Sequence, residues 1–254
     1  MATSIMTNNG RTQRTIDFFA KTNMYVGIGQ ETDWTAEPTP DIAIDTLEKI
    51  NELVAIKKIE TPKYVRIQTG GDILFNNNTW VEVSATEQTI TASTISFVSA
   101  TNTINDTGAG MPIFEVGTRI KVIGSTGDNY FIVVTSNASD LVVSDLTFDE
   151  AVGNSITIKS NLETNDINNI FYEAVFAYDN DSLPVGIDYR QIGLLEKPVE
   201  LTTESLCTNN VYLAAGLSAV AEYPQGVLHY IDNRAPIYRT SSQREAIQFI
   251  VEFW

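Results

Sequence analysis

Two glycines beside an aromatic residue raise the first question of chemistry in this sequence. Gly27 and Gly29 stand in the run NMYVGIGQETDW, where the aromatic and aliphatic residues are typical of a strand. A dinucleotide-binding fingerprint needs a third glycine three residues after the second, at the start of a helix that binds pyrophosphate. Thr32 occupies that position, and Trp34 and two prolines follow it. The pattern therefore favours a backbone that passes close to another chain segment, or the relief of a strand bend, over a phosphate site.

Nucleophilic catalysis would depend on Cys207 and His229, the only cysteine and the only histidine of the chain. Their surroundings, TESLCTNN and GVLHYID, match no nucleophile motif, and no serine occupies a Gly-x-Ser-x-Gly turn. One cysteine and one histidine cannot form a structural zinc site. The sequence predicts neither a catalytic centre nor a cofactor.

Acidic residues are the remaining candidates for chemistry. The run DNDSLPVGID brings Asp179, Asp181 and Asp188 together, but Leu183 and Arg190 occupy the fifth and twelfth positions, where a calcium loop needs oxygen donors. A solvated acidic turn is the better interpretation. A pair of carboxylates for glycoside hydrolysis stays open, because sequence does not give their separation in space.

The balance of charge limits the partners of the protein. The 254 residues include 32 acidic and 16 basic side chains, for a formal charge of −16. Such a surface repels nucleic-acid phosphates and anionic lipids, so we expect neither nucleic acid nor a membrane as partner. A single cysteine allows no internal disulfide. No run approaches the roughly 20 apolar residues of a membrane span.

Helical and polar patterns appear in the first 60 residues. Residues 1–15 are polar and weakly patterned, which predicts a flexible N-terminal arm. Thr39 can cap a helix, Pro40 suits its first position, and apolar residues from Leu47 to Val54 follow helical spacing. The sequence therefore predicts one prominent helix over residues 39–60.

Residues 84–160 have a different residue pattern, with β-branched runs separated by turn signals such as NDTGAG and GSTGDN. Five short strands at this spacing predict a small barrel or sandwich. We expect a mainly β (α+β) protein in which this all-β domain is inserted into a mixed host domain formed by residues 16–83 and 161–254. A plain tandem of two domains is the alternative. Pairing of the last strand, AIQFIVEFW, with the strand near Tyr25 would favour the insertion.

Two stretches carry a family resemblance. The first motif, AKTNMYVGIGQETDWTAEPTPD (residues 20–41), and the second motif, YRQIGLLEKP (residues 189–198), resemble segments of phage virion proteins related to the baseplate wedge subunit of T-even contractile-tailed phages. In that family the two segments come in the same order, separated by a variable region. The resemblance implies a role in a shared fold and an assembly surface for these residues: Tyr25, Gly27, Gly29, Trp34, Tyr189, Arg190, Gln191, Ile192 and Gly193.

The resemblance also implies a function. It indicates a non-enzymatic structural subunit of a phage tail or baseplate, assembled in the host cytoplasm and located in the virion. Its partners would be other tail, baseplate or neck proteins and further copies of itself. A receptor- or carbohydrate-binding tail-fibre module, using Trp34, Trp80 or Trp254, is one alternative. An enzyme that uses two carboxylates is the other.

Overall fold

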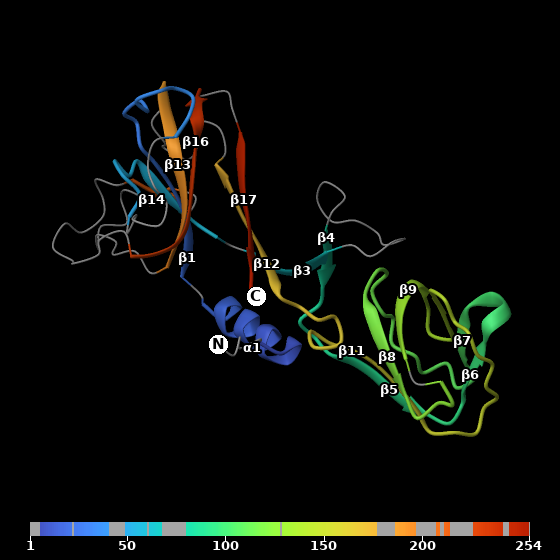
Figure 1. Cartoon of the computed structure of the whole chain (residues 1–254). Helices are drawn as coiled ribbons and strands as arrows, with labels where there is room; N and C mark the ends of the chain where they lie inside the picture. The colour runs from blue at the N-terminus through green and yellow to red at the C-terminus, as the bar shows by residue number, and fades with distance from the viewer. Residues whose placement is uncertain are drawn as a thin grey trace, which may run out of the picture. The chain divides into compact units, whose positions relative to one another are not determined.

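The computed structural model shows a mainly β protein, as the sequence predicts (Figure 1). It describes residues 6–21, 23–40, 49–59, 61–67, 80–127, 129–176, 186–196, 207–208, 211–213, 226–240 and 244–253. These residues form three antiparallel sheets and one α-helix, α1 (Asn8–Phe19).

Strands from both halves of the sequence share a six-stranded sheet. Its strands are β1 (Met24–Gly29), β2 (Ala55–Lys58), β13 (Ile187–Glu196), β14 (Cys207–Thr208), β15 (Val211–Leu213) and β16 (Val227–Arg239), in the order β14-β15-β2-β1-β13-β16. All six residues of β1 are buried. A strand that is covered on both faces explains why MYVGIG lacks polar alternation.

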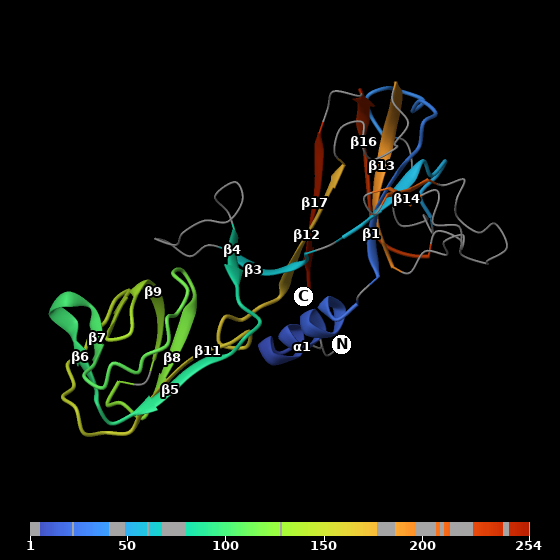
Figure 2. The same ribbon diagram turned by 180° about the vertical axis from the view of Figure 1, so that it is seen from behind.

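A seven-stranded sheet is built entirely within residues 88–160, and Figures 1 and 2 show its strands gathered together. Its strands are β5 (Gln88–Ala92), β6 (Ile95–Val98), β7 (Thr103–Asp106), β8 (Arg119–Ile123), β9 (Tyr130–Ser136), β10 (Asp140–Val143) and β11 (Ile156–Ser160), in the order β5-β11-β8-β9-β10-β7-β6. Alternate residues such as Ile156 and Ile158 are buried in its core. That residues 84–160 form a separate inserted domain stays a prediction.

The third sheet has four strands: β17 (Glu245–Glu252), β12 (Asn169–Phe176), β3 (Lys63–Ile67) and β4 (Trp80–Val83), in that order. β3 and β4 are antiparallel neighbours, and the Gly70–Gly71 turn expected between them lies outside the described residues. The last strand, β17, is the neighbour of β12 and not of β1, contrary to the pairing that would have favoured an insertion. Instead, β13 is the strand that joins β1 to the C-terminal half.

The chain divides into two compact units, and each contains segments that are distant in the sequence. The first unit comprises Met1–Phe18, Lys63–Phe171 and Val251–Trp254, and the second comprises Phe19–Pro62 and Tyr172–Ile250. The six-stranded sheet belongs to the second unit, and the seven-stranded sheet to the first.

The helix predicted over residues 39–60 is wrong where the structure describes these residues. Residues 55–58 form β2 and not the end of a helix, because Ala55–Lys58 pairs with β1 on one side and β15 on the other. Tertiary pairing there overrides helical spacing. The expected helical residues 41–48 lie outside the described residues.

The expected flexible arm is largely helical, since α1 begins at Asn8. The Thr7 hydroxyl accepts a hydrogen bond of 3.2 Å from the Gly10 amide, which caps the helix N-terminus. Thr12 and Thr15 are buried. Capping and burial therefore stabilise a helix whose sequence has no apolar stripe.

Candidate functional site

The two motifs of the family resemblance are brought together, as neighbouring strands of the six-stranded sheet. β1 and β13 are antiparallel, and their register sets Gly27 opposite Gly193 and Ile28 opposite Ile192. Gly29 lies opposite Gln191. The paired residues are 162 to 172 positions apart in the sequence, so only the fold makes the two motifs one site.

The glycines of both motifs allow one side chain to cross the sheet closely. A Cβ atom on Gly27 would lie 2.6 Å from Cδ1 of Ile50, and one on Gly193 would lie 2.7 Å from the same atom. At Gly29 a Cβ would meet the carbonyl oxygen of Asn51 at 2.5 Å. Real side chains do not tolerate such distances, so the segment at Ile50 can pack here only over glycine.

Arg190 of the second motif binds the acidic segment that follows the first motif. Its side chain is only 2% exposed. Nη2 forms an ion pair with Asp33, Nε forms one with Glu37, and Nη1 donates a hydrogen bond of 2.6 Å to the carbonyl of Glu31. Asp188 lies 3.6 Å away and adds a further carboxylate. A planar guanidinium can make these contacts in several directions at once, which fixes the course of residues 31–37.

Trp34 anchors the same segment to β16. Its ring is 3% exposed, and its indole Nε1 donates a 2.7 Å hydrogen bond to the carbonyl of Arg234. That carbonyl is accessible because the register of β13 and β16 shifts between Tyr189 and Gln191, where a bulge interrupts the pairing. Trp34 therefore offers no free face to a sugar ring.

The neighbouring residues of the second motif are also used inside the chain. The Gln191 side chain accepts a 2.7 Å hydrogen bond from the Asn51 amide and donates one of 2.8 Å to Asn233. The Tyr189 hydroxyl donates a 3.0 Å bond to Glu245. Burial, together with the charge of Glu245, raises the pKa of Tyr189 well above its usual range. The side chains of Tyr25 and Ile192 are buried.

A second charged cluster lies at the far end of β13. Glu196 forms an ion pair with Lys21, and its Oε2 lies 2.9 Å from His229 Nε2. Burial opposes ionisation of this carboxyl, but the hydrogen bonds from Lys21 and His229 outweigh it and lower the pKa of Glu196 from 4.5 to about 2. The one histidine is thus a partner of a carboxylate.

The other residues considered for chemistry are not assembled into a site in the described structure. Asp179 and Asp181 lie outside the described residues, as does Trp254. Cys207 lies in β14, where its backbone pairs with Tyr212. Among the described residues, no three side chains of His, Cys, Asp or Glu gather where they could hold a metal ion. In that same part of the chain, no helix has the length and apolar character needed to span a membrane.

The sequence alone does not predict the residues that contact the two motifs, namely Ile50 at the glycines and Asp33 and Glu37 at Arg190. Helical spacing predicts a helix through Ile50, and no sequence pattern connects Arg190 with the acidic residues that it binds. The prolines after Trp34 are the one sequence signal for these contacts. They indicate an extended segment, which needs contacts with other parts of the chain to be fixed.

The geometry of the two motifs defines a class of site. Polar side chains of both motifs are hydrogen-bonded to other parts of the same chain, which is typical of a structural crossing. Residues 1–118 match the protein family described as "Baseplate wedge 3 tail fiber network component". This match supports a baseplate wedge-like phage protein, and over residues 1–118 it confirms the resemblance seen in the sequence. No curated protein matches the chain.

Proposed function

We propose that this protein is a non-enzymatic structural subunit of a phage tail baseplate, in the network that joins the baseplate wedge to the tail fibres. The observation that carries the proposal is the family match over residues 1–118, which includes the first motif and the acidic segment that Arg190 binds. Such a subunit functions through contacts with other baseplate proteins and with further copies of itself. Its place of action would be the virion, after assembly in the host cytoplasm.

The motif residues would contribute to assembly indirectly. Arg190 and Trp34 are buried, so they do not face a neighbouring protein themselves. They hold residues 31–37, in which Asp33 remains 77% exposed although it is paired with Arg190. A segment that is already ordered binds with a smaller loss of conformational entropy. We propose that this segment is one contact surface of the subunit.

The charge of the chain supports protein partners over nucleic acid or membrane. With a formal net charge of −16, the chain repels polyanions and remains dispersed before assembly. The carbohydrate-binding alternative, which would use tryptophan or tyrosine rings, has no accessible ring at Trp34, because that side chain is buried.

Complementation in the phage tests the proposal. A phage that lacks this gene should form particles with incomplete tails, and a plasmid copy of the wild-type gene should restore complete tails in electron micrographs. Arg190→Gln should restore fewer, whereas Arg234→Gln, which removes a half-exposed arginine paired with Asp232, should restore wild-type numbers. Complete and infectious particles without the gene would contradict the proposal.

A further inference from the structure

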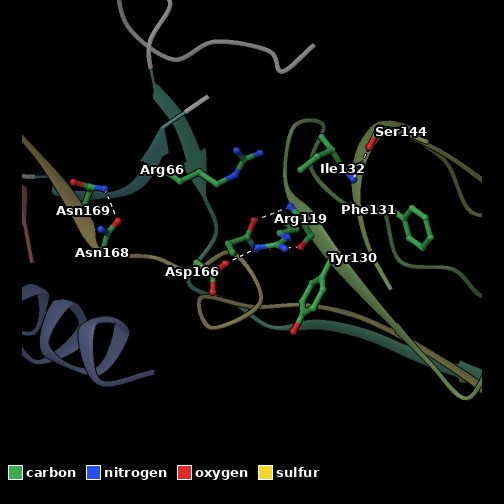
Figure 3. Close-up of a pocket in the computed structure, with 10 residues that line it drawn as sticks. Arg66, Arg119, Tyr130, Phe131, Ile132, Ser144, Asp166, Asn168 and Asn169 are labelled. Atoms are coloured by element: carbon green, nitrogen blue, oxygen red, sulfur yellow. Dashed lines mark hydrogen bonds and ion pairs between the residues drawn. The ribbon is translucent and has the colours of Figure 1, made fainter. Parts of the chain in front are cut away.

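A cavity of about 470 Å³ lies in the first unit, apart from the paired motifs. It is lined by residues of β3, β8 and β9 and by Ser144, Asn165, Asp166, Asn168 and Asn169 (Figure 3). Its volume falls in the range of ligand-binding pockets, roughly 300–1,000 Å³. No residue of either motif lines it, so the cavity is a separate feature of the molecule.

Two arginines reach the cavity from opposite walls (Figure 3). Arg66 extends from β3, is 7% exposed, and donates a hydrogen bond from Nη2 to the carbonyl of Gly117. Arg119 begins β8 and forms an ion pair with Asp166. Its guanidinium also lies over the ring of Tyr130, 4.3 Å from the ring centre. Both guanidinium groups are therefore held in place by neighbouring groups.

The charges of the walls indicate which ligand would fit. Two guanidinium groups and one carboxylate, that of Asp166, line the cavity of a chain whose net charge is −16. Guanidinium groups bind the oxygens of carboxylates and phosphates. These charges sum to +1, so a single carboxylate balances them, whereas a doubly charged phosphate would leave an uncompensated negative charge beside Asp166.

The remaining walls suit the carbon part of such a ligand. The ring of Tyr130 and the side chain of Ile132 line the cavity beside Arg119. An aliphatic stem can pack on them while its charged end binds the arginines. Glutamate combines a short aliphatic stem with one carboxylate.

We propose that this cavity binds the side-chain carboxylate of an acidic residue, glutamate above all, presented by a neighbouring protein of the particle. The choice of a protein as the source rests on the proposed function. The cavity itself is argued from the placement of Arg66, Arg119 and Asp166.

The experiment titrates the purified full-length protein with N-acetyl-glutamate amide at constant ionic strength. The arginine Nε–Hε signals in NMR spectra report binding, and the matching glutamine amide is the uncharged probe. The signals of Arg66 and Arg119 should shift and saturate with the glutamate compound and not with the glutamine compound. Arg66→Gln and the more exposed Arg119→Gln should each weaken binding at least tenfold.

Lys63→Gln is the matched control, because Lys63 lies on the same strand as Arg66, pairs with Glu82, and does not line the cavity. It should leave binding unchanged. Unperturbed arginine signals, or equal shifts with both compounds, would overturn the proposal. If Arg66→Gln loses its fold, Arg119→Gln still decides the outcome, since its side chain lies at the partly exposed wall.

Incorporation into particles distinguishes the source of the carboxylate. Arg119→Gln protein should enter phage particles in reduced amounts. Normal incorporation, together with clear binding of the glutamate compound, would overturn the protein source in favour of a free carboxylate. Absence of the wild-type chain from particles would instead overturn the proposed function, while the titration would still show whether the cavity binds carboxylates.

Discussion

Gly27 and Gly193 are direct partners across β1 and β13, and the side chain of Ile50 fills the space that a methyl group on either glycine would need. Cδ1 of Ile50 lies 2.6 Å and 2.7 Å from the two Cβ positions, whereas carbon atoms in contact are about 3.5–4.0 Å apart. Two motifs that are distant in the sequence thus form one packing site, and Ile50, which belongs to neither motif, occupies it.

Gly193→Ala should destabilise the protein by about 1–3 kcal/mol, because its new methyl group overlaps Ile50 and comes within 2.9 Å of Leu228. Urea unfolding followed by circular dichroism measures the change. Gly110→Ala is the control. Its Cβ would have no neighbour closer than 3.6 Å, so stability should change far less.

Removing the overlapping atom should relieve the strain. Ile50→Val deletes Cδ1 and should cost about 0.5–1.5 kcal/mol in the wild-type protein. In that background, Gly193→Ala should cost less than it does alone, which gives a favourable coupling energy in a double-mutant cycle. Strict additivity of the two changes would contradict the close contact.

Arg190→Gln should lower the free energy of unfolding by roughly 1–3 kcal/mol, because it removes the charge-assisted hydrogen bonds from the buried guanidinium to Asp33 and Glu37. Arg190→Lys should recover part of the loss because it keeps the charge but not the planar fork. Arg234→Gln, which breaks the more exposed pair with Asp232, should cost about 1 kcal/mol or less. Equal costs for the Arg190→Gln and Arg234→Gln variants would mean that Arg190 does not fix the acidic segment.

These motifs also show how far the sequence could predict the site. The sequence singles out the residues of both motifs and indicates that another segment passes close to the glycines; in the structure, Ile50 and Asn51 pack against them. The sequence does not predict the partners of Arg190. Asp33 and Glu37 are 157 and 153 positions away, and ion pairs leave no periodic pattern in a sequence. The helix expected through Ile50 failed for a similar reason, since the strands that pair with Ala55–Lys58 are set by the fold.

The free energy of unfolding should fall in acid because Glu196 becomes protonated. Hydrogen bonds from Lys21 and His229 lower its pKa in the folded state to about 2, below the ordinary 4.5. The carboxylate therefore stabilises the fold fully above about pH 4.5, and this contribution is lost as the pH falls toward 2. Glu196→Gln should reduce the slope of unfolding free energy against pH in this window. Glu82→Gln removes a half-exposed carboxylate that pairs with Lys63 and serves as the control for the loss of one charge.

The helix α1 should depend on its cap. Thr7→Ala removes the hydroxyl that accepts the Gly10 amide and should cost about 1 kcal/mol. Amide hydrogen exchange at Gly10 should become faster. Thr7→Ser keeps a capping hydroxyl and should retain slow exchange, and a Thr7→Ala protein with unchanged exchange would show that packing alone sets the helix start.

The most direct test of the whole account is the number of copies of this chain in purified phage particles, measured by mass spectrometry with isotope-labelled standard peptides. A structural subunit of the baseplate should be present in a fixed number of copies per particle, and that number should survive repeated gradient purification. Loss of the chain during purification, or its presence only in the soluble fraction of infected cells, would contradict the account.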